Sequence, residues 1–292
     1  MKISLHPVFI LFAAAAVASG EHIWFLMAFG AVTLHEMAHI AVAFKCGLRV
    51  ERLSITPLGE QARIVDMESL TQGPRIAIAL AGPAMSLALA LCFRKASPDF
   101  ATANLAVLLL NIMPAYPLDG GRVIHIILGN SLGILRANRI AKTLSKVTSA
   151  LMFTAGLAVT ILFPYNISLV LVAAYLWRNM DIERVRMMCD FFRFFDGRRF
   201  GKRKAVRARF YVVEPETEII CALERLCWDT YGIFAVKSGD SLGDSIDESA
   251  VFAGFLEKSG GDMGTLAEER RKKSETACEN ETACESETIN KH

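Results

Sequence analysis

Apolar residues are concentrated in six runs in the first part of the chain, and polar residues separate these runs. The runs cover about residues 8–19, 23–44, 76–93, 100–113, 147–163 and 167–177. A helix that crosses a bilayer needs roughly 20 mostly apolar residues, and several of these runs are shorter. The pattern predicts an α-helical polytopic membrane protein with about six transmembrane segments.

Charge is distributed unevenly along the 292 residues. The chain is 53% hydrophobic and only 21% charged, and the charge is concentrated after Trp177. Such asymmetry favours a membrane region followed by a water-exposed region. Lys and Arg collect in the cytoplasmic loops of membrane proteins. With six segments and a cytoplasmic N-terminus, the outer loops carry only Arg94 and Lys95, so both termini are expected in the cytoplasm.

One apolar run, residues 23–44, contains His35, Glu36 and His39. Residues four apart lie on one face of a helix, so the two imidazoles can bind one Zn²⁺ while Glu36 acts as general base on the metal-bound water. Each ionisable residue at bilayer depth costs about 2.5 to 3.5 kcal/mol, and a shared metal ion offsets this cost. The alternative is a helix whose polar face only packs against its neighbours.

A zinc site needs a third protein ligand, and Asp119 is the favoured candidate. Pro114 and Pro117 break the helix before it, and two glycines follow it, so its side chain can project from irregular backbone. Glu60 is the rival ligand, and it is expected in a loop with Pro57, Gly59 and Gln61. An Asp that merely closes a prolyl turn is the structural alternative for position 119.

His125 lies six residues after Asp119. It could orient a metal-ligating side chain by a hydrogen bond, because metal ligands commonly have such partners. A single His in an apolar stretch is more often a packed residue, and we favour that interpretation.

Two motifs in this chain resemble those of the site-2 protease family of intramembrane zinc metalloproteases. They are His35-Glu36-x-x-His39 and Asn111-x-x-Pro114-x-x-Pro117-Leu118-Asp119-Gly120-Gly121. The resemblance covers about residues 5–180, the expected membrane-embedded domain (residues 1–180). It implies a metalloendopeptidase in which His35, His39 and Asp119 bind Zn²⁺ and Glu36 activates water. It also implies that Asn111 and Pro117 contact the substrate.

Within that family the chain is most similar to members that act in spore formation. This narrower likeness rests on Leu5-His6-Pro7, on Ala81-Gly82-Pro83 and on a basic aromatic stretch before a small C-terminal domain. It implies a membrane-associated pro-sigma factor as substrate and membrane-embedded inhibitory partners. It also implies a location in the membrane around the forespore, with the tail facing the mother cell. Two departures are Ser86, where many members carry Asn, and Pro57-Leu58-Gly59-Glu60, where Pro-Phe-Gly-Gly is usual.

Residues 52–65 alternate apolar and polar stretches around a Pro and a Gly. They could form a β-hairpin whose edge pairs with an extended substrate, or a solvated loop, and the sequence favours neither.

The C-terminal part divides into three regions by composition. Residues 181–207 are expected to be a basic amphipathic linker at the membrane surface, not a nucleic-acid-binding patch. Residues 208–266 have the order strand (209–213), helix (219–228), strand (233–237), helix (248–257). This order resembles one cystathionine-β-synthase-type (CBS) repeat, a module that in this family can bind ATP and other adenine nucleotides. A plain α/β domain for homo-oligomerisation or partner docking is the alternative. Residues 267–292 are polar and are expected to be disordered.

Three classes of function fit these features. The favoured one is an intramembrane metalloprotease. The others are a transporter or metal permease with a His/Asp ion path, and an inactive scaffold. No internal duplication of the kind found in transporters is evident, and the intact Glu36 opposes the scaffold.

Overall fold

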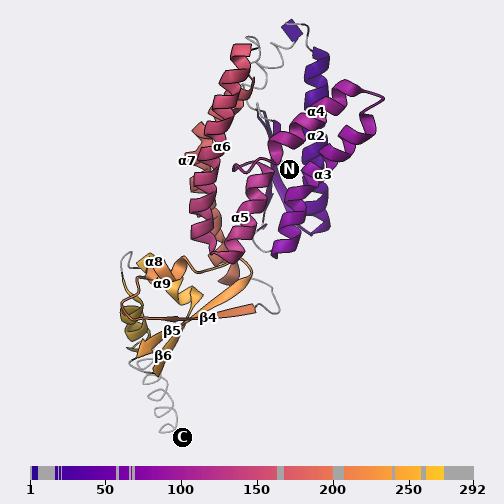
Figure 1. The fold of residues 1–292 in the computed structure, drawn as a ribbon. Coiled ribbons are helices and arrows are strands. Elements are labelled where there is room, and N and C mark those ends of the chain that lie inside the picture. Colours follow the sequence, from indigo (N-terminus) through magenta and orange to yellow (C-terminus); the bar gives the residue numbers. More distant parts are fainter. Residues whose placement is uncertain are drawn as a thin grey trace, which may run out of the picture. The chain divides into compact units, whose positions relative to one another are not determined.

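The computed structural model describes residues 2–5, 17–18, 20, 22–56, 59–65, 67, 70–162, 168–199, 207–238, 241–257 and 261–272. The chain divides into two compact units. The first comprises residues 1–129 and 137–194, and the second comprises residues 130–136 and 195–292 (Figure 1).

The first unit is mainly helical. Its helices are α2 (His22–Lys45), α3 (Gln72–Phe93), α4 (Pro98–Asn111), α5 (Asp119–Ser131), α6 (Ile134–Leu162) and α7 (Ser168–Arg199). Helices α2, α3 and α4 pack against one another. Helices α6 and α7 run side by side, with Gly156 of α6 close to Val170 of α7 (Figure 1).

Three of the described helices, α2, α3 and α6, are long and apolar enough to cross a membrane, and residues Leu169–Arg178 of α7 form a shorter apolar stretch. The predicted count of six segments is therefore only partly supported. The predicted segment 100–113 is α4, whose 14 residues are too few for a full crossing. The predicted segment 8–19 lies outside the described residues except for 17 and 18. Large apolar side chains such as Leu91, Leu151 and Ile161 are exposed on the long helices, as expected for contact with lipid.

The boundaries of α4 and α5 follow from local sequence. Pro98 occupies the first turn of α4, where its missing N–H costs no hydrogen bond. The helix ends at Asn111, shortly before Pro114, because proline disfavours helical backbone in the preceding residue. Helix α5 begins at Asp119, and a carboxylate is favourable at this positive end of a helix dipole.

The first unit also contains a three-stranded sheet. Strand β1 (Lys2–Leu5) pairs in parallel with β2 (Arg49–Thr56), and β2 pairs antiparallel with β3 (Gly59–Val65). The hairpin alternative for residues 52–65 is thus the one observed. Strand β3 is at one edge of the sheet and contacts α2, the helix that carries His35 and His39.

The second unit contains its own sheet of strand order β4-β5-β6. Its elements are β4 (Arg207–Val213), α8 (Ile219–Leu223), β5 (Thr230–Ser238), β6 (Ser241–Asp247) and α9 (Glu248–Glu257). Strands β4 and β5 are parallel, whereas β5 and β6 are antiparallel. Trp228, Phe234 and Met263 are among its fully buried side chains.

Several predictions for this region were wrong in detail. The helix expected over 219–228 ends at Leu223, and Leu226 and Trp228 are instead buried without helical backbone. Strand β6 was not predicted, because Ser241–Asp247 is polar and only one of its residues is buried. Residues 263–272 are helical and extend into the region expected to be disordered; residues 273–292 lie outside the described part. One expectation holds: helix α7 continues to Arg199, so most of the amphipathic linker is helical, as its pattern predicted.

The turn between α5 and α6 belongs to the second unit. Asn130 exchanges two hydrogen bonds with Asp229: its Nδ2 donates to Oδ2 at 3.1 Å, and its Oδ1 accepts from the Asp229 N–H at 3.2 Å. The Ile134 N–H donates to the Leu226 carbonyl at 2.9 Å. Gly133 has φ +96° and lies so close to the Glu224 carbonyl that a Cβ would overlap it. The end of α5 and the start of α6, residues 130–136, are therefore part of the second unit.

Candidate metal centre

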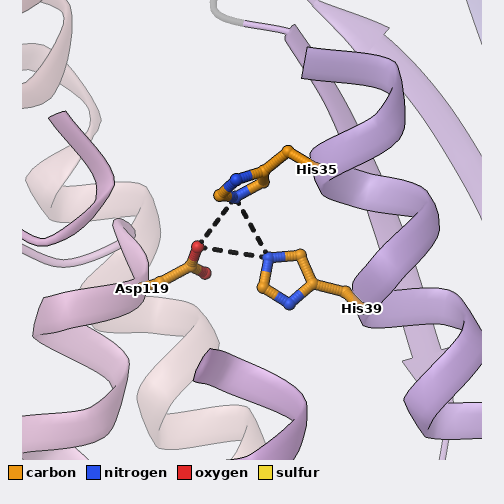
Figure 2. Close-up of side chains that lie close together, drawn as sticks. All are labelled: His35, His39 and Asp119. Carbon is orange, nitrogen blue, oxygen red and sulfur yellow. Dashed lines mark hydrogen bonds and ion pairs between the residues drawn. The ribbon is translucent and has the colours of Figure 1, made fainter. Parts of the chain in front are cut away.

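Three side chains from two distant segments meet inside the first unit (Figure 2). His35 and His39 come from α2, and Asp119 comes from the first turn of α5. Asp119 Oδ2 lies 3.0 Å from His35 Nε2 and 3.1 Å from His39 Nε2, and the two Nε2 atoms are 3.2 Å apart. All three residues are at most 4% exposed. The structure therefore brings together the three residues that the sequence suggested as ligands.

The donor set fits a divalent cation for a specific reason. His39 Nδ1 lies 2.7 Å from the Ile78 carbonyl, which can only accept, so Nδ1 carries the proton. The lone pair of a neutral His39 is then on Nε2, which faces a carboxylate oxygen and a second imidazole nitrogen. Three electron-rich atoms this close together need a shared positive charge. Two imidazoles and one carboxylate are a common ligand set for catalytic Zn²⁺.

The remaining charged groups surround the three ligand atoms. Glu36 is half-buried on α2 and lies within electrostatic reach of His39 and Arg122. Arg122 Nη1 is 3.7 Å from Asp119 Oδ1, the oxygen that does not face the imidazoles. The arrangement places an acid–base side chain beside the group that could hold the metal.

Helix α3 approaches the two imidazoles more closely than the sequence indicated. A Cβ on Gly82 would overlap Nε2 of both His35 and His39. Ser86, one helical turn further, has its Oγ 2.9 Å from His35 Nδ1. The sequence had shown Gly82 only as part of Ala-Gly-Pro and Ser86 only as a departure from Asn. The feature of the sequence that could have indicated this contact is the four-residue spacing of the small residues Gly82 and Ser86.

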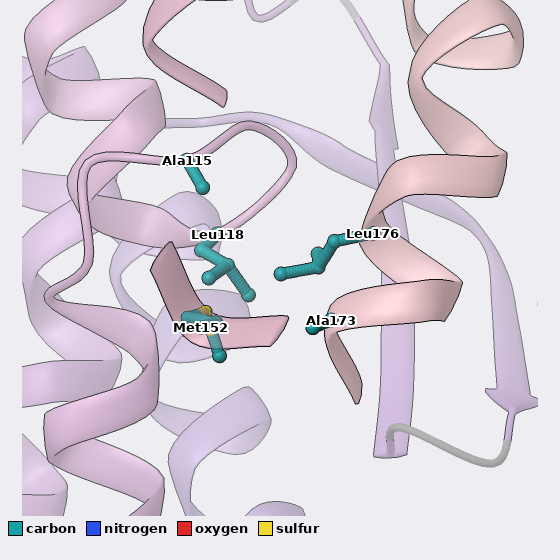
Figure 3. Packing of buried hydrophobic residues seen from close by; sticks show 5 residues of the cluster. All are labelled: Ala115, Leu118, Met152, Ala173 and Leu176. Atoms are coloured by element: carbon teal, nitrogen blue, oxygen red, sulfur yellow. The ribbon is translucent and has the colours of Figure 1, made fainter. Parts of the chain in front are cut away.

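The loop before Asp119 is held by α6 and α7. Ser145 Oγ accepts a hydrogen bond from the Tyr116 N–H at 2.8 Å. Ala115 and Leu118 pack against Met152 of α6 and against α7 (Figure 3). The α7 residues of this cluster are Ala173 and Leu176. Asp119 therefore follows a loop that is held in place by contacts with α6 and α7.

Gly120 and Gly121 do not form the irregular backbone that the sequence predicted after Asp119. Both lie in helix α5, and neither is among the described glycines with positive φ. A Cβ at Gly120 would overlap the Ile112 carbonyl, and one at Gly121 would overlap the Ala115 carbonyl. The glycines let α5 start directly against the loop, and this close packing determines where Asp119 lies.

The other candidate residues do not join the three ligands. Asn111 Nδ2 donates to the Val107 carbonyl of its own helix at 3.0 Å. Pro117 follows a cis peptide bond in the α4–α5 loop. His125 Nε2 lies against Asn138 Oδ1, and burial lowers the pKa of His125 to about 4, so its ring is neutral at pH 7. The backbone of Glu60 is in β3, and its side chain lies outside the described part.

Comparison with known proteins gives three findings. The model of peptidase family M50 matches residues 23–97, which include His35, Glu36 and His39. A zinc metalloprotease of Methanocaldococcus jannaschii is 30% identical over 203 residues, which cover 63% of this chain and 58% of the relative. Stage IV sporulation protein FB of Bacillus subtilis is 23% identical over 274 residues, or 88% of this chain and 93% of the relative.

A solved structure is also similar. The site-2 protease from Methanocaldococcus jannaschii matches with a TM-score of 0.52 and 27% identity. The match covers 62% of this chain and 90% of that chain. The family model covers His35 and His39 of the three candidate ligands, and Asp119 lies beyond the residues that it matches.

Proposed function

Because residues 23–97 match the model of peptidase family M50, we propose that this chain is an intramembrane zinc metallopeptidase in which His35, His39 and Asp119 bind the metal. One observation carries the proposal: three buried ligand atoms, all within 4.8 Å of one another, converge from segments 80 or more residues apart. One relative is named a zinc metalloprotease and the similar structure is named a site-2 protease, which supports the same chemistry. Exposed apolar surfaces on long helices support a site within the membrane.

In peptide hydrolysis at this centre, the metal and the protein side chains have separate roles. Zinc, when bound, lowers the pKa of a water molecule to about 7 and polarises a carbonyl oxygen. Glu36 accepts a proton as the water oxygen bonds to the scissile carbon, and it delivers that proton to the amide nitrogen as the C–N bond breaks. His35, His39 and Asp119 would hold the metal, and their buried position excludes bulk water.

The proposed substrate is a membrane-associated protein whose scissile segment is extended. A helix hides its carbonyls in internal hydrogen bonds, so the substrate must unwind before attack. Strand β3 offers an unpaired edge beside α2, within the described residues, and an extended peptide can add to such an edge. We expect the substrate to bind there as a fourth strand.

Replacing Ala62 with Pro tests this edge. In a hairpin with a two-residue connection, the Thr56–Gly59 pair exchanges hydrogen bonds and the pairs then alternate, so the Leu53–Ala62 pair points its N–H and C=O groups outward. Proline at Ala62 removes an outward N–H without breaking the β2–β3 ladder. Cleavage should slow about 2- to 10-fold with unchanged zinc content. Ala62→Val, which keeps the N–H, should cleave normally, and normal cleavage by the proline variant would exclude edge pairing.

The biological role is proposed from the relative that aligns over most of the chain. Its name, stage IV sporulation protein FB, supports a role in spore formation. A pro-sigma factor substrate, inhibitory membrane partners and a forespore-membrane location are proposed from the family resemblance. Cytoplasmic termini are proposed from the distribution of Lys and Arg along the chain. The CBS-like nature of the second unit, its binding of ATP and homo-oligomerisation stay predictions.

The direct test is cleavage with product mapping. The full chain is co-expressed with a membrane-associated pro-sigma factor, and the product's new N-terminus is sequenced. We expect one defined cut that 1,10-phenanthroline abolishes and added Zn²⁺ restores. Asp119→Asn should also abolish it, because the carboxylate charge is lost from the ligand set. Cleavage that persists with the chelator would refute the metallopeptidase proposal. Cleavage of other membrane proteins, but not of the pro-sigma factor, would refute the proposed substrate.

A further inference from the structure

One face of α3 contacts both candidate imidazole ligands. Ile78, Gly82 and Ser86 are spaced four residues apart, so they form a single stripe along the helix. The Ile78 carbonyl lies 2.7 Å from His39 Nδ1, and the Ser86 hydroxyl lies 2.9 Å from His35 Nδ1. Gly82 lies between them, where any side chain would overlap the rings. Each imidazole is therefore contacted on its outer nitrogen by α3.

The two outer contacts differ in one respect. A backbone carbonyl fixes the proton of His39 on Nδ1, and no substitution can remove that carbonyl. The Ser86 hydroxyl can donate or accept, so the proton position on His35 depends on it. A ligand imidazole needs its inner nitrogen unprotonated, and the partner of the outer nitrogen sets this tautomer.

The hydroxyl of Ser86 hydrogen-bonds to another helix, unlike several other hydroxyls in these helices. Ser145 donates to the carbonyl of Ala141, and Thr160 donates to the carbonyl of Gly156, four residues back in each case. Such bonds are the usual way to satisfy a hydroxyl inside an apolar helix. Ser86 is fully buried, and within the described part of the chain its hydrogen-bond partner is His35. Its position is explained by the imidazole and not by its own helix.

We propose that Ser86 is a positioning residue that accepts a hydrogen bond from His35 Nδ1 and thereby directs the His35 Nε2 lone pair at the metal. The inference rests on the proposed metallopeptidase function, and it assigns a role to a side chain that departs from the Asn of many family members. Ser86 does not touch the reacting atoms. Its effect is exerted through the orientation and tautomer of one ligand.

The test is metal affinity of the purified full-length chain in detergent, measured by competition for Zn²⁺ with a chelator. Ser86→Ala should weaken zinc binding about 10- to 100-fold, the usual cost of losing such a partner. Ser86→Thr keeps the hydroxyl and should restore most of the affinity. Ser149→Ala is the matched control, because Ser149 is also buried and its Oγ has no hydrogen-bond partner in the described part of the chain.

Cobalt substitution gives a second readout that simple loss of packing would not change. The visible absorption of bound Co²⁺ reports ligand geometry, so Ser86→Ala should alter the spectrum while Ser149→Ala should not. Equal zinc affinity and equal cobalt spectra in Ser86→Ala and the wild-type chain would overturn the role of Ser86 and leave the proposed function intact. A wild-type chain that binds neither metal would overturn the proposed function itself.

Discussion

The Glu36→Gln variant should remain folded, retain zinc and lose cleavage. Gln has nearly the same shape as Glu but cannot accept the proton of the attacking water. General base catalysis contributes about 10²- to 10⁴-fold, so the cleavage rate should fall by at least the lower figure. Zinc should stay because Glu36 is not among the three converging ligand atoms. The measurements are zinc content of the purified protein and the rate of product formation from the co-expressed substrate.

The same variant separates the three classes of function. A transporter or metal permease that uses a His/Asp path would keep much of its flux without Glu36, and an inactive scaffold would be unaffected. Asp99→Asn is a suitable control, because Asp99 is an exposed carboxylate in the first turn of α4. It should cleave at the wild-type rate. Cleavage by Glu36→Gln at the wild-type rate would remove Glu36 from the mechanism.

Gly82→Ala should abolish zinc binding and with it all cleavage. The added methyl group would overlap the Nε2 atoms of His35 and His39, which both face Asp119. Alanine is favoured over glycine inside a helix by about 1 kcal/mol, so the substitution stabilises α3 itself. A loss of zinc can therefore be attributed to the metal centre and not to the helix. Metal analysis of the purified protein and circular dichroism measure the two effects separately.

Gly73→Ala provides the matched control in the same helix. Nothing lies within 4 Å of a Cβ at Gly73, so zinc content and cleavage should be unchanged. If Gly82→Ala bound zinc as tightly as the wild-type chain, α3 could not approach the imidazoles as closely as the structure indicates. The role inferred for Ser86 on the same face of α3 would then fail as well.

Local patterns in the sequence predicted those features that depend on residues near one another in the chain. The spacing of His35 and His39 requires only one helical turn, and α2 provides it. The hairpin of residues 52–65 depends on a turn between adjacent strands, and it was one of two predicted alternatives. The segment count was less reliable, because run length alone does not distinguish α4 from a membrane-crossing helix.

The sequence by itself determined that one helix carries two imidazoles on one face, and it named Asp119 as a partner from the helix-breaking residues around it. Only the tertiary structure decided that Asp119 meets these imidazoles, 80 or more residues away, and that Gly82 and Ser86 complete their surroundings. Periodicity describes what lies on one face of one element. The separation of two elements depends instead on the sizes of the side chains between them, and here a glycine in α3 sets it.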